Sequence, residues 1–135
     1  MKKIVNFLLV TAFMLFSTMS LQAQSYRATD GFVPAKAYIT GDGFEMVHNV
    51  AVDIYIDSSY NHVDFQVRSE MVDNYFVHFN VDYMNCTENG YCLHLDKNST
   101  LVIENTMLGK EYKLTMRNTQ DADITKLVFL FYTMY

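Results

Sequence analysis

The sequence has no tryptophan, one proline, five glycines and two cysteines among its 135 residues. No stretch rich in proline, glycine and serine interrupts it, so the composition marks no linker between two domains. Basic residues are also scarce, with ten Lys and Arg against fifteen Asp and Glu. An acidic chain without a basic stripe is a poor candidate for binding nucleic acid. We therefore expect one domain with no nucleic-acid partner.

Motifs of catalysis are absent as well. The sequence contains no G-x-S-x-G nucleophile motif, no glycine-rich phosphate loop, no C-x-x-C redox pair and no EF-hand spacing. Nothing in it assembles a nucleophile, a base and an oxyanion hole. We expect no catalytic residues, no enzymatic activity and no cofactor.

The N-terminus has the three parts of a secretory signal peptide. Lys2 and Lys3 form a positive start, an apolar run follows at Ile4–Phe16, and a segment ending in Ala23 offers a cleavage site. The apolar run is shorter than the about 20 residues that span a bilayer, and no basic stop-transfer cluster follows it. We expect residues 1–23 to be removed. Residues 24–135 would then form an exported domain, periplasmic or secreted, without a transmembrane segment.

Half of the residues are hydrophobic and only 19% are charged, which excludes a disordered polyelectrolyte. Apolar and polar residues alternate in several short runs, as expected of strands with one buried face. These runs are Val50–Ile56, Val63–Val67, Tyr75–Tyr83, Tyr91–Leu95, Leu101–Ile103 and Tyr112–Met116, with a weaker one at Ala35–Thr40. Leu127–Tyr132 is apolar throughout and predicts a strand covered on both faces. Seven or eight strands favour an all-β fold, either an antiparallel immunoglobulin-like sandwich or a small β-barrel.

The two cysteines flank a turn signal. A three-residue loop, Glu88-Asn89-Gly90, with Gly90 in the left-handed conformation would place Cys86 opposite Cys92. The Cα atoms of such a pair approach to about 4.5 Å, within reach of a disulfide. We therefore predict a disulfide between them, which an exported chain is placed to form.

The same register would place Tyr83 opposite Leu95 on the apolar face, as the last of five alternate residues that begin at Tyr75 and share one buried face. On the other face Asp82 would lie opposite Asp96, with His94 beside them. Two carboxylates and an imidazole can hold a divalent cation or share a proton. Facing carboxylates also repel each other, and we expect a solvated face with no metal here.

The order of these runs resembles a family of small exported β-sandwich proteins of Bacteroides-type bacteria, which has no assigned function. The resemblance covers residues 50–131, through the segments VDIYI, VDFQV, YFVHFNV, STLVIENTMLGKEYKLTM and LVFLF, and extends to the LQAQ at the end of the signal peptide, where cleavage is expected after Ala23. It implies an immunoglobulin-like sandwich and no activity.

Tyrosine supplies the main argument for function. Tyr26, Tyr55, Tyr60 and Tyr135 fall at turns, ends or polar positions of strands, where a phenol can face a protein or glycan partner; alternatively, these rings cap the core. We expect a non-enzymatic exported binding module. One alternative is an inhibitor of a secreted protease that presents the loop Glu88-Asn89-Gly90. Another is a surface filament or adhesin subunit whose last strand inserts into a neighbour.

Overall fold

The computed structural model describes residues 26–69, 74–117 and 123–134. The expected signal peptide and Tyr135 lie outside these residues. Nine strands are present: β1 (Tyr26–Arg27), β2 (Val33–Gly41), β3 (Phe44–Ile56), β4 (His62–Arg68), β5 (Tyr75–Cys86), β6 (Gly90–Leu95), β7 (Ser99–Asn105), β8 (Gly109–Met116) and β9 (Ile124–Met134). The all-β, antiparallel fold is thereby confirmed, with slightly more strands than the seven or eight expected.

The strand pairings form a ring. From β2 to β9, each strand pairs antiparallel with the next along the chain. A further pairing of β2 with β9 closes the ring, and β1 adds to the end of β3. This sequential order is that of a meander, whereas immunoglobulin-like domains use Greek-key connections.

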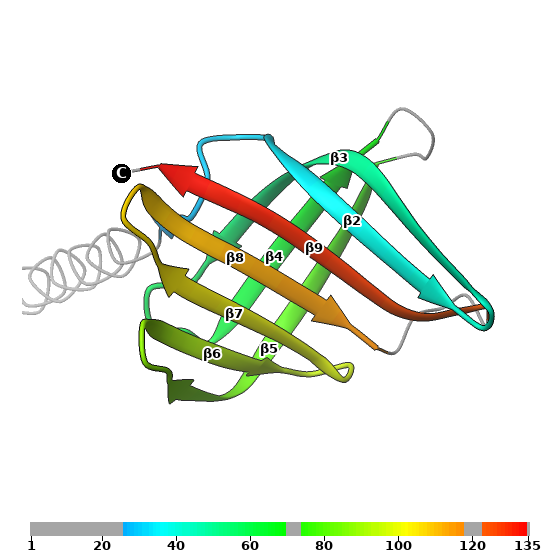
Figure 1. Ribbon diagram of the computed structural model, residues 1–135. Coiled ribbons are helices and arrows are strands. Elements are labelled where there is room, and N and C mark those ends of the chain that lie inside the picture. Colours follow the sequence, from blue (N-terminus) through cyan, green and yellow to red (C-terminus); the bar gives the residue numbers. More distant parts are fainter. Residues whose placement is uncertain (1–25, 70–73, 118–122, 135) are drawn as a thin grey trace, which may run out of the picture.

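The ring is arranged in two layers (Figure 1). Strands β2, β9, β8 and β7 cross in front of β3, β4 and β5. The long strand β3 belongs to both sides of the closure, because residues 44–52 pair with β2 and residues 51–56 pair with β4. Closed pairing is a property of barrels, and two facing layers are a property of sandwiches.

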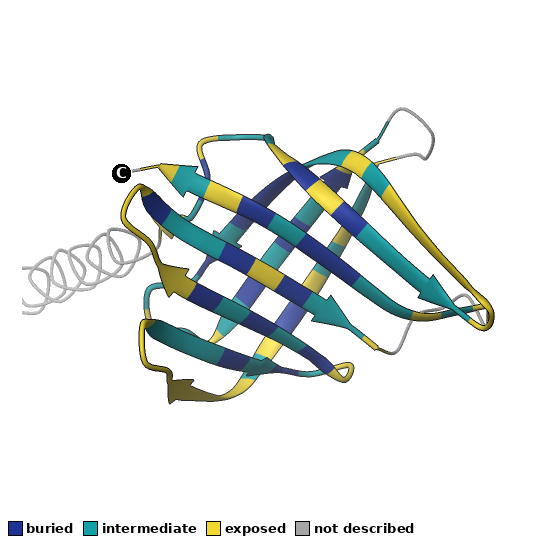
Figure 2. Ribbon diagram, in the orientation of Figure 1, coloured by how far each residue is buried: buried dark blue, intermediate teal, exposed yellow. Residues whose placement is uncertain are grey.

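The core lies between the layers and follows the predicted alternation. Buried and more exposed residues alternate along the strands (Figure 2), because successive side chains of a strand point to opposite faces. Four phenylalanines fill its centre, and the ring of Phe65 lies 4.9 Å from that of Phe129. The largest fully buried side chains are Phe65, Phe79, Phe129, Phe131, Ile54, Ile56, Leu93, Leu101, Ile103, Leu114, Val52 and Val63.

Strand β5 departs from the expected pattern. Val81 pairs with Leu95, but Tyr83 pairs with His94, so the register shifts around Asp82. Such a bulge moves the following residues to the other face of the strand. The prediction that Tyr83 ends a buried row opposite Leu95 is therefore wrong: its side chain is 56% exposed and stacks on His94.

Strand β9 is not buried on both faces along its whole length, because part of its outer face is exposed. Phe129 and Phe131 point into the core and are buried, whereas Tyr132 between them and the strand end is 57% exposed. The continuous apolar run therefore gives β9 an apolar outer face as well as a core face. In the described part of the chain no helix has the length and apolar character needed to cross a membrane.

Candidate functional site

The outer face of β3, β4 and β5 carries a hollow of about 330 Å³. This face belongs to the rear layer of Figure 1. We call the feature the outer hollow, and its lining residues are Arg27, Asp53, Tyr55, Asp64, Gln66 and Phe76. It contains Tyr55, which the sequence singled out, together with five residues that it did not.

Strand register explains why these six side chains meet. Tyr55 lies opposite both Arg27 of β1 and Asp64 of β4. Asp53 lies opposite Gln66, which in turn lies opposite Phe76 of β5. The residues thus form two neighbouring rows across the strands, and residues two apart on a strand share a face. Their neighbours in the sequence point inward, which leaves this polar and aromatic set outside.

Asp53 is the buried anchor of the hollow. Asp53 is only 5% exposed, although its side chain lies on the outer face of the sheet. The guanidinium of Arg27 donates to one carboxylate oxygen at 2.6 Å, and the hydroxyl of Thr29 donates to the other at 2.7 Å. The Thr29 hydroxyl also accepts a hydrogen bond from the backbone N–H of Ile54. A buried carboxylate needs such partners, and they fix both Asp53 and Arg27 in place.

Asp64 is held by a histidine on the next strand. Its Oδ1 atom lies 2.5 Å from Nδ1 of His78. The hydrogen bond that the ring of His78 donates to Asp64 raises the pKa of His78 above its ordinary value, because it stabilises the protonated ring. The ring of His62 stacks on that of His78, with centroids 5.5 Å apart, and on that of Tyr55 at 5.9 Å. Aromatic stacking and one hydrogen bond therefore order the row of side chains that contains Tyr55 and Asp64.

The loop that would bind a protease under the inhibitor alternative is a tight exposed tip. The backbone N–H of Thr87 donates to the carbonyl of Gly90 at 2.8 Å, which leaves Glu88 and Asn89 as a two-residue turn. The backbone N–H of Asn105 also donates to the carbonyl of Asn89. The tip is therefore fixed from two sides.

Gly90 has another role than the one expected. It is not among the glycines with a positive φ, which are Gly31 and Gly43 in the described residues. Instead, a Cβ atom at Gly90 would lie 1.9 Å from the carbonyl oxygen of Ile103 on β7. A glycine is required here because two backbones approach closely.

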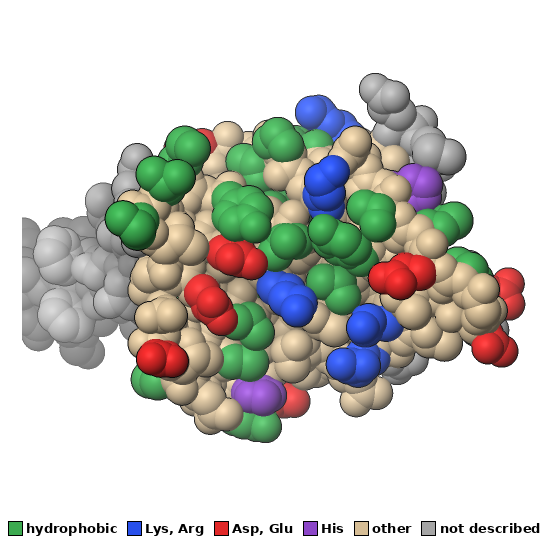
Figure 3. All heavy atoms as spheres, viewed as in Figure 1, with side chains coloured by type: hydrophobic (Ala, Val, Ile, Leu, Met, Phe, Trp, Pro, Cys, Tyr) green, Lys and Arg blue, Asp and Glu red, His purple; other side chains and the backbone are tan. Residues whose placement is uncertain are grey.

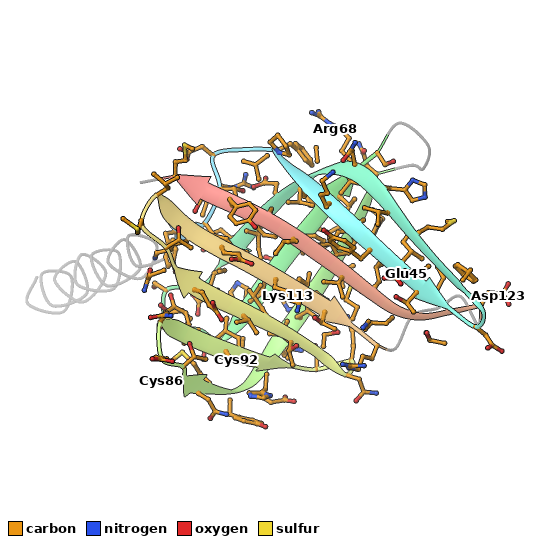
Figure 4. All side chains as sticks on the ribbon, in the orientation of Figure 1. Glu45, Arg68, Cys86, Cys92, Lys113 and Asp123 are labelled. Atoms are coloured by element: carbon orange, nitrogen blue, oxygen red, sulfur yellow. The ribbon has the colours of Figure 1, made fainter. Side chains whose placement is uncertain are left out.

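The expected disulfide is absent, and the prediction of a Cys86–Cys92 pair is wrong in this structure. With a two-residue turn, Cys86 lies opposite Tyr91 and Cys92 lies opposite Asn85. The cysteines lie on neighbouring strands (Figure 4) but are offset by one residue, so their side chains leave opposite faces. Both thiols are free. Burial raises the pKa of Cys92.

The sequence predicted that Asp82 lies opposite Asp96, with His94 beside them, and the structure does not bring these three side chains together. Asp82 occupies the bulge, and Asp96 accepts hydrogen bonds from the backbone and side-chain N–H groups of Asn80 at 3.1 Å. His94 stacks on Tyr83 at 4.1 Å and lies 3.2 Å from the amide nitrogen of Asn85. Within residues 26–69, 74–117 and 123–134, no three His, Cys, Asp or Glu residues are placed to hold a metal ion.

Tyr60 belongs to a tyrosine group at one end of the ring. Its hydroxyl donates to that of Tyr91 at 3.0 Å, and the rings meet edge to face. Burial, and next the hydrogen bond with Tyr60, raise the pKa of Tyr26 to about 12. Burial also raises the pKa of Tyr112. Tyr60 packs against the core, so it lies apart from Tyr55 and the outer hollow.

The opposite face of the ring has a different character. There, Figure 3 shows hydrophobic side chains mixed with Lys, Asp and Glu over β2, β9 and β8. A hollow of about 300 Å³ includes Tyr38, Leu130, Glu111 and Lys113 in its lining. Strand β9, which would insert into a neighbouring subunit under the filament alternative, is paired here on both edges, with β2 and β8.

Sequence reasoning missed most of the outer hollow, although one signal was present. Asp64 and Gln66 alternate with buried Val63, Phe65 and Val67, which assigns them to an outer face. The alternation along this strand does not reveal which residues of the neighbouring strands lie opposite Asp64 and Gln66. No protein-family model, no curated protein and no solved structure matches the chain.

Proposed function

We propose that the chain is an exported binding module without enzymatic activity, which recognises a macromolecular partner at the outer hollow. The observation that carries the proposal is the hollow itself, in which polar and aromatic side chains converge on regular strands. Binding sites are typically concave, with aromatic groups and a few well-placed polar groups. Export rests on the signal-peptide pattern of residues 1–23.

The polar groups of the hollow support binding, since they are fixed before a partner arrives. Asp53 is held by Arg27 and Thr29, and Asp64 by His78. A preorganised site loses less conformational entropy when it binds. Among the six lining residues, Tyr55 is the sole hydroxyl-bearing side chain and none is a cysteine. The Asp64–His78 pair therefore has no serine or thiol in the lining to activate.

Phe76 gives the proposal a sharp test. Its side chain is 55% exposed. Tyr132 lies on the opposite face of the molecule with a similar exposed fraction, 57%, and serves as the control position. The exported protein, Phe76→Ala and Tyr132→Ala would each be immobilised and exposed to surface and secreted material of the source cells. We expect the wild type and Tyr132→Ala to retain the same component and Phe76→Ala to lose it. Equal retention by Phe76→Ala would contradict a partner at the outer hollow.

A second candidate function is inhibition of a secreted protease by the β5–β6 tip. The observation that favours it is the double anchoring of the turn, through Thr87 with Gly90 and Asn105 with Asn89. A rigid exposed loop suits a protease cleft for the same entropic reason. Inhibition assays with the wild type and Glu88→Ala Asn89→Ala test this candidate, and loss of inhibition in the variant is the expected result.

A further inference from the structure

We infer that the outer hollow binds a neutral sugar ring of a glycan, with one face of the ring on Phe76 and its hydroxyls on Asp64, Gln66 and Arg27. This inference rests on the proposed function and names the ligand class of the same site. The six lining residues combine one aromatic platform with hydrogen-bonding groups of both kinds.

The dimensions suit one ring. Neighbouring strands lie about 4.8 Å apart, so the four strands β1, β3, β4 and β5 that supply the lining span about 14 Å between backbones. The two rows are two residues apart along each strand, which corresponds to about 7 Å. The volume of about 330 Å³ stands at the lower end of the range for small-molecule sites, roughly 300–1,000 Å³. A single monosaccharide unit of a chain therefore fits better than an extended peptide segment.

The charges favour a neutral ligand. The carboxylate of Asp53 is paired with Arg27 at 2.6 Å, and that of Asp64 faces His78 at 2.5 Å. An anionic ligand would meet two carboxylates, and the single guanidinium of the lining is already engaged by one of them. A cationic ligand would have to compete with Arg27 for Asp53 and with His78 for Asp64. Both carboxylates of the lining are therefore already hydrogen-bonded to basic side chains, and the hydrogen-bonding capacity that remains suits an uncharged ligand.

The remaining hydrogen-bonding groups match hydroxyls. Gln66 offers an amide that both donates and accepts, Asp64 retains acceptor sites beyond the one used by His78, and Arg27 retains donors beyond the one used by Asp53. A sugar hydroxyl both donates and accepts, so it can use this mixed set, whereas a purely apolar ligand would leave these groups without water or partners.

Phe76 supplies the apolar half of the recognition. It lies opposite Gln66 on β4, so ring and amide stand side by side on one face. With 55% of its surface exposed, the phenyl ring is open to contact. Pyranose rings carry C–H groups on their faces and hydroxyls around their edges. A ring laid on Phe76 would gain dispersion contacts while its edge reaches the polar neighbours.

Affinity electrophoresis with neutral polysaccharides in the gel (a glucan, a galactan, a mannan and an arabinan) tests the inference. Polygalacturonate and poly-lysine serve as the negatively and positively charged comparison polymers. Calorimetry with oligosaccharides of whichever polymer slows the protein in the gel then gives the Kd. We expect at least one neutral polysaccharide to retard the exported protein. The Kd should rise at least tenfold in Phe76→Ala and in Gln66→Ala, and remain unchanged in Tyr132→Ala. Gln66→Ala decides the matter if Phe76→Ala fails to fold.

The inference fails if no neutral polysaccharide binds the wild type, if a charged polymer binds in preference, or if both hollow variants bind as tightly as the wild type. Its failure is distinguishable from that of the proposed function. A cell-surface component that is lost with Phe76→Ala, combined with no polysaccharide binding, would retain the hollow as a binding site and reject the sugar. If Phe76→Ala lost neither the cell-surface component nor the binding of polysaccharide, both the proposed function and the sugar inference would be rejected.

Discussion

Asp64 and His78 face each other across β4 and β5, with 2.5 Å between Oδ1 and Nδ1. Their strands are directly paired, so the contact depends on the register of the sheet rather than on a loop. Asp64 also lines the outer hollow. The ionisation of His78 therefore reports on the geometry of the candidate site.

We expect NMR titration to give His78 a pKa above the ordinary value of about 6.5. In Asp64→Asn the pKa should fall, because the hydrogen bond to a carboxylate is lost. A raised folded-state pKa means that the pair stabilises the fold below the unfolded pKa and that this contribution disappears as the pH rises through the folded pKa. The effect on stability is small, since His78 is half exposed. An unchanged pKa in Asp64→Asn would show that the two side chains do not meet.

Phe79 tests the position of the core. Its side chain is fully buried, and Phe79→Ala should lower the free energy of unfolding by about 3–5 kcal/mol. Chemical denaturation measures the change, with exposed Phe76→Ala as the matched control on the same strand. A loss below about 1 kcal/mol at Phe79 would mean that the inward and outward faces of β5 are exchanged.

Gly90 tests the close approach of β6 and β7. In Gly90→Ala the new methyl group would meet the carbonyl of Ile103, so we expect a loss of about 2–3 kcal/mol in stability. Gly43→Ala is the comparison, because open space surrounds Gly43 and only its positive φ opposes alanine. That cost is about 1 kcal/mol. Equal losses would show that crowding by β7 is unimportant.

The cysteines are expected to remain reduced in the folded protein. The offset of Cys86 and Cys92 by one residue prevents a bond without movement of the strand. Mass spectrometry of the non-reduced, alkylated protein should find two alkylated thiols, with exposed Cys86 modified before Cys92. A mass two hydrogens lower, without alkylation, would demonstrate the disulfide and a different register at the end of β5.

The hydroxyls of Tyr75 and Tyr60 differ in whether they have a hydrogen-bond partner among the described residues. The Tyr75 hydroxyl is buried and has no hydrogen-bond partner among the described residues, and burial raises its pKa to about 12. Tyr75→Phe should therefore leave stability unchanged or raise it by up to about 1 kcal/mol. Tyr60→Phe removes the hydrogen bond to Tyr91 and should cost about 1 kcal/mol. Urea denaturation compares them, and a clear loss in Tyr75→Phe would reveal a partner for its hydroxyl.

The positions of most strands could be predicted because alternation is a local property. Val63, Phe65 and Val67 are buried as their spacing required, and the weak run after Pro34 is part of β2. Pairing between strands is not local in this sense. The bulge at Asp82 adds one residue to β5 without any mark in the hydrophobic pattern, and it reverses the faces of the residues that follow.

The same limit explains the candidate site. Tyr55 could be selected from its own strand, whereas the hollow depends on Asp64, Gln66 and Phe76 standing in line with β3. Their alignment depends on the connection between β3 and β4 and on the connection between β4 and β5, and the lengths of these connections do not specify the register of the strands. Gly90 illustrates the opposite error, in which a common turn role was assigned to a residue that β7 restricts.

The closed ring of pairings also makes the starting point of the chain arbitrary. β2 and β9 are antiparallel neighbours, with Ala35 opposite Phe131, so the first and last strands of the ring run side by side. A circular permutant that joins these ends through a linker and begins at Asn89 would keep every strand neighbour. It would make the local β5–β6 hairpin a contact between distant parts of the chain, and it would make the distant β2–β9 pairing a local one. Because one long-range pairing replaces another, the contact order and the folding rate should change little, and no pairing between strands is removed from the native state.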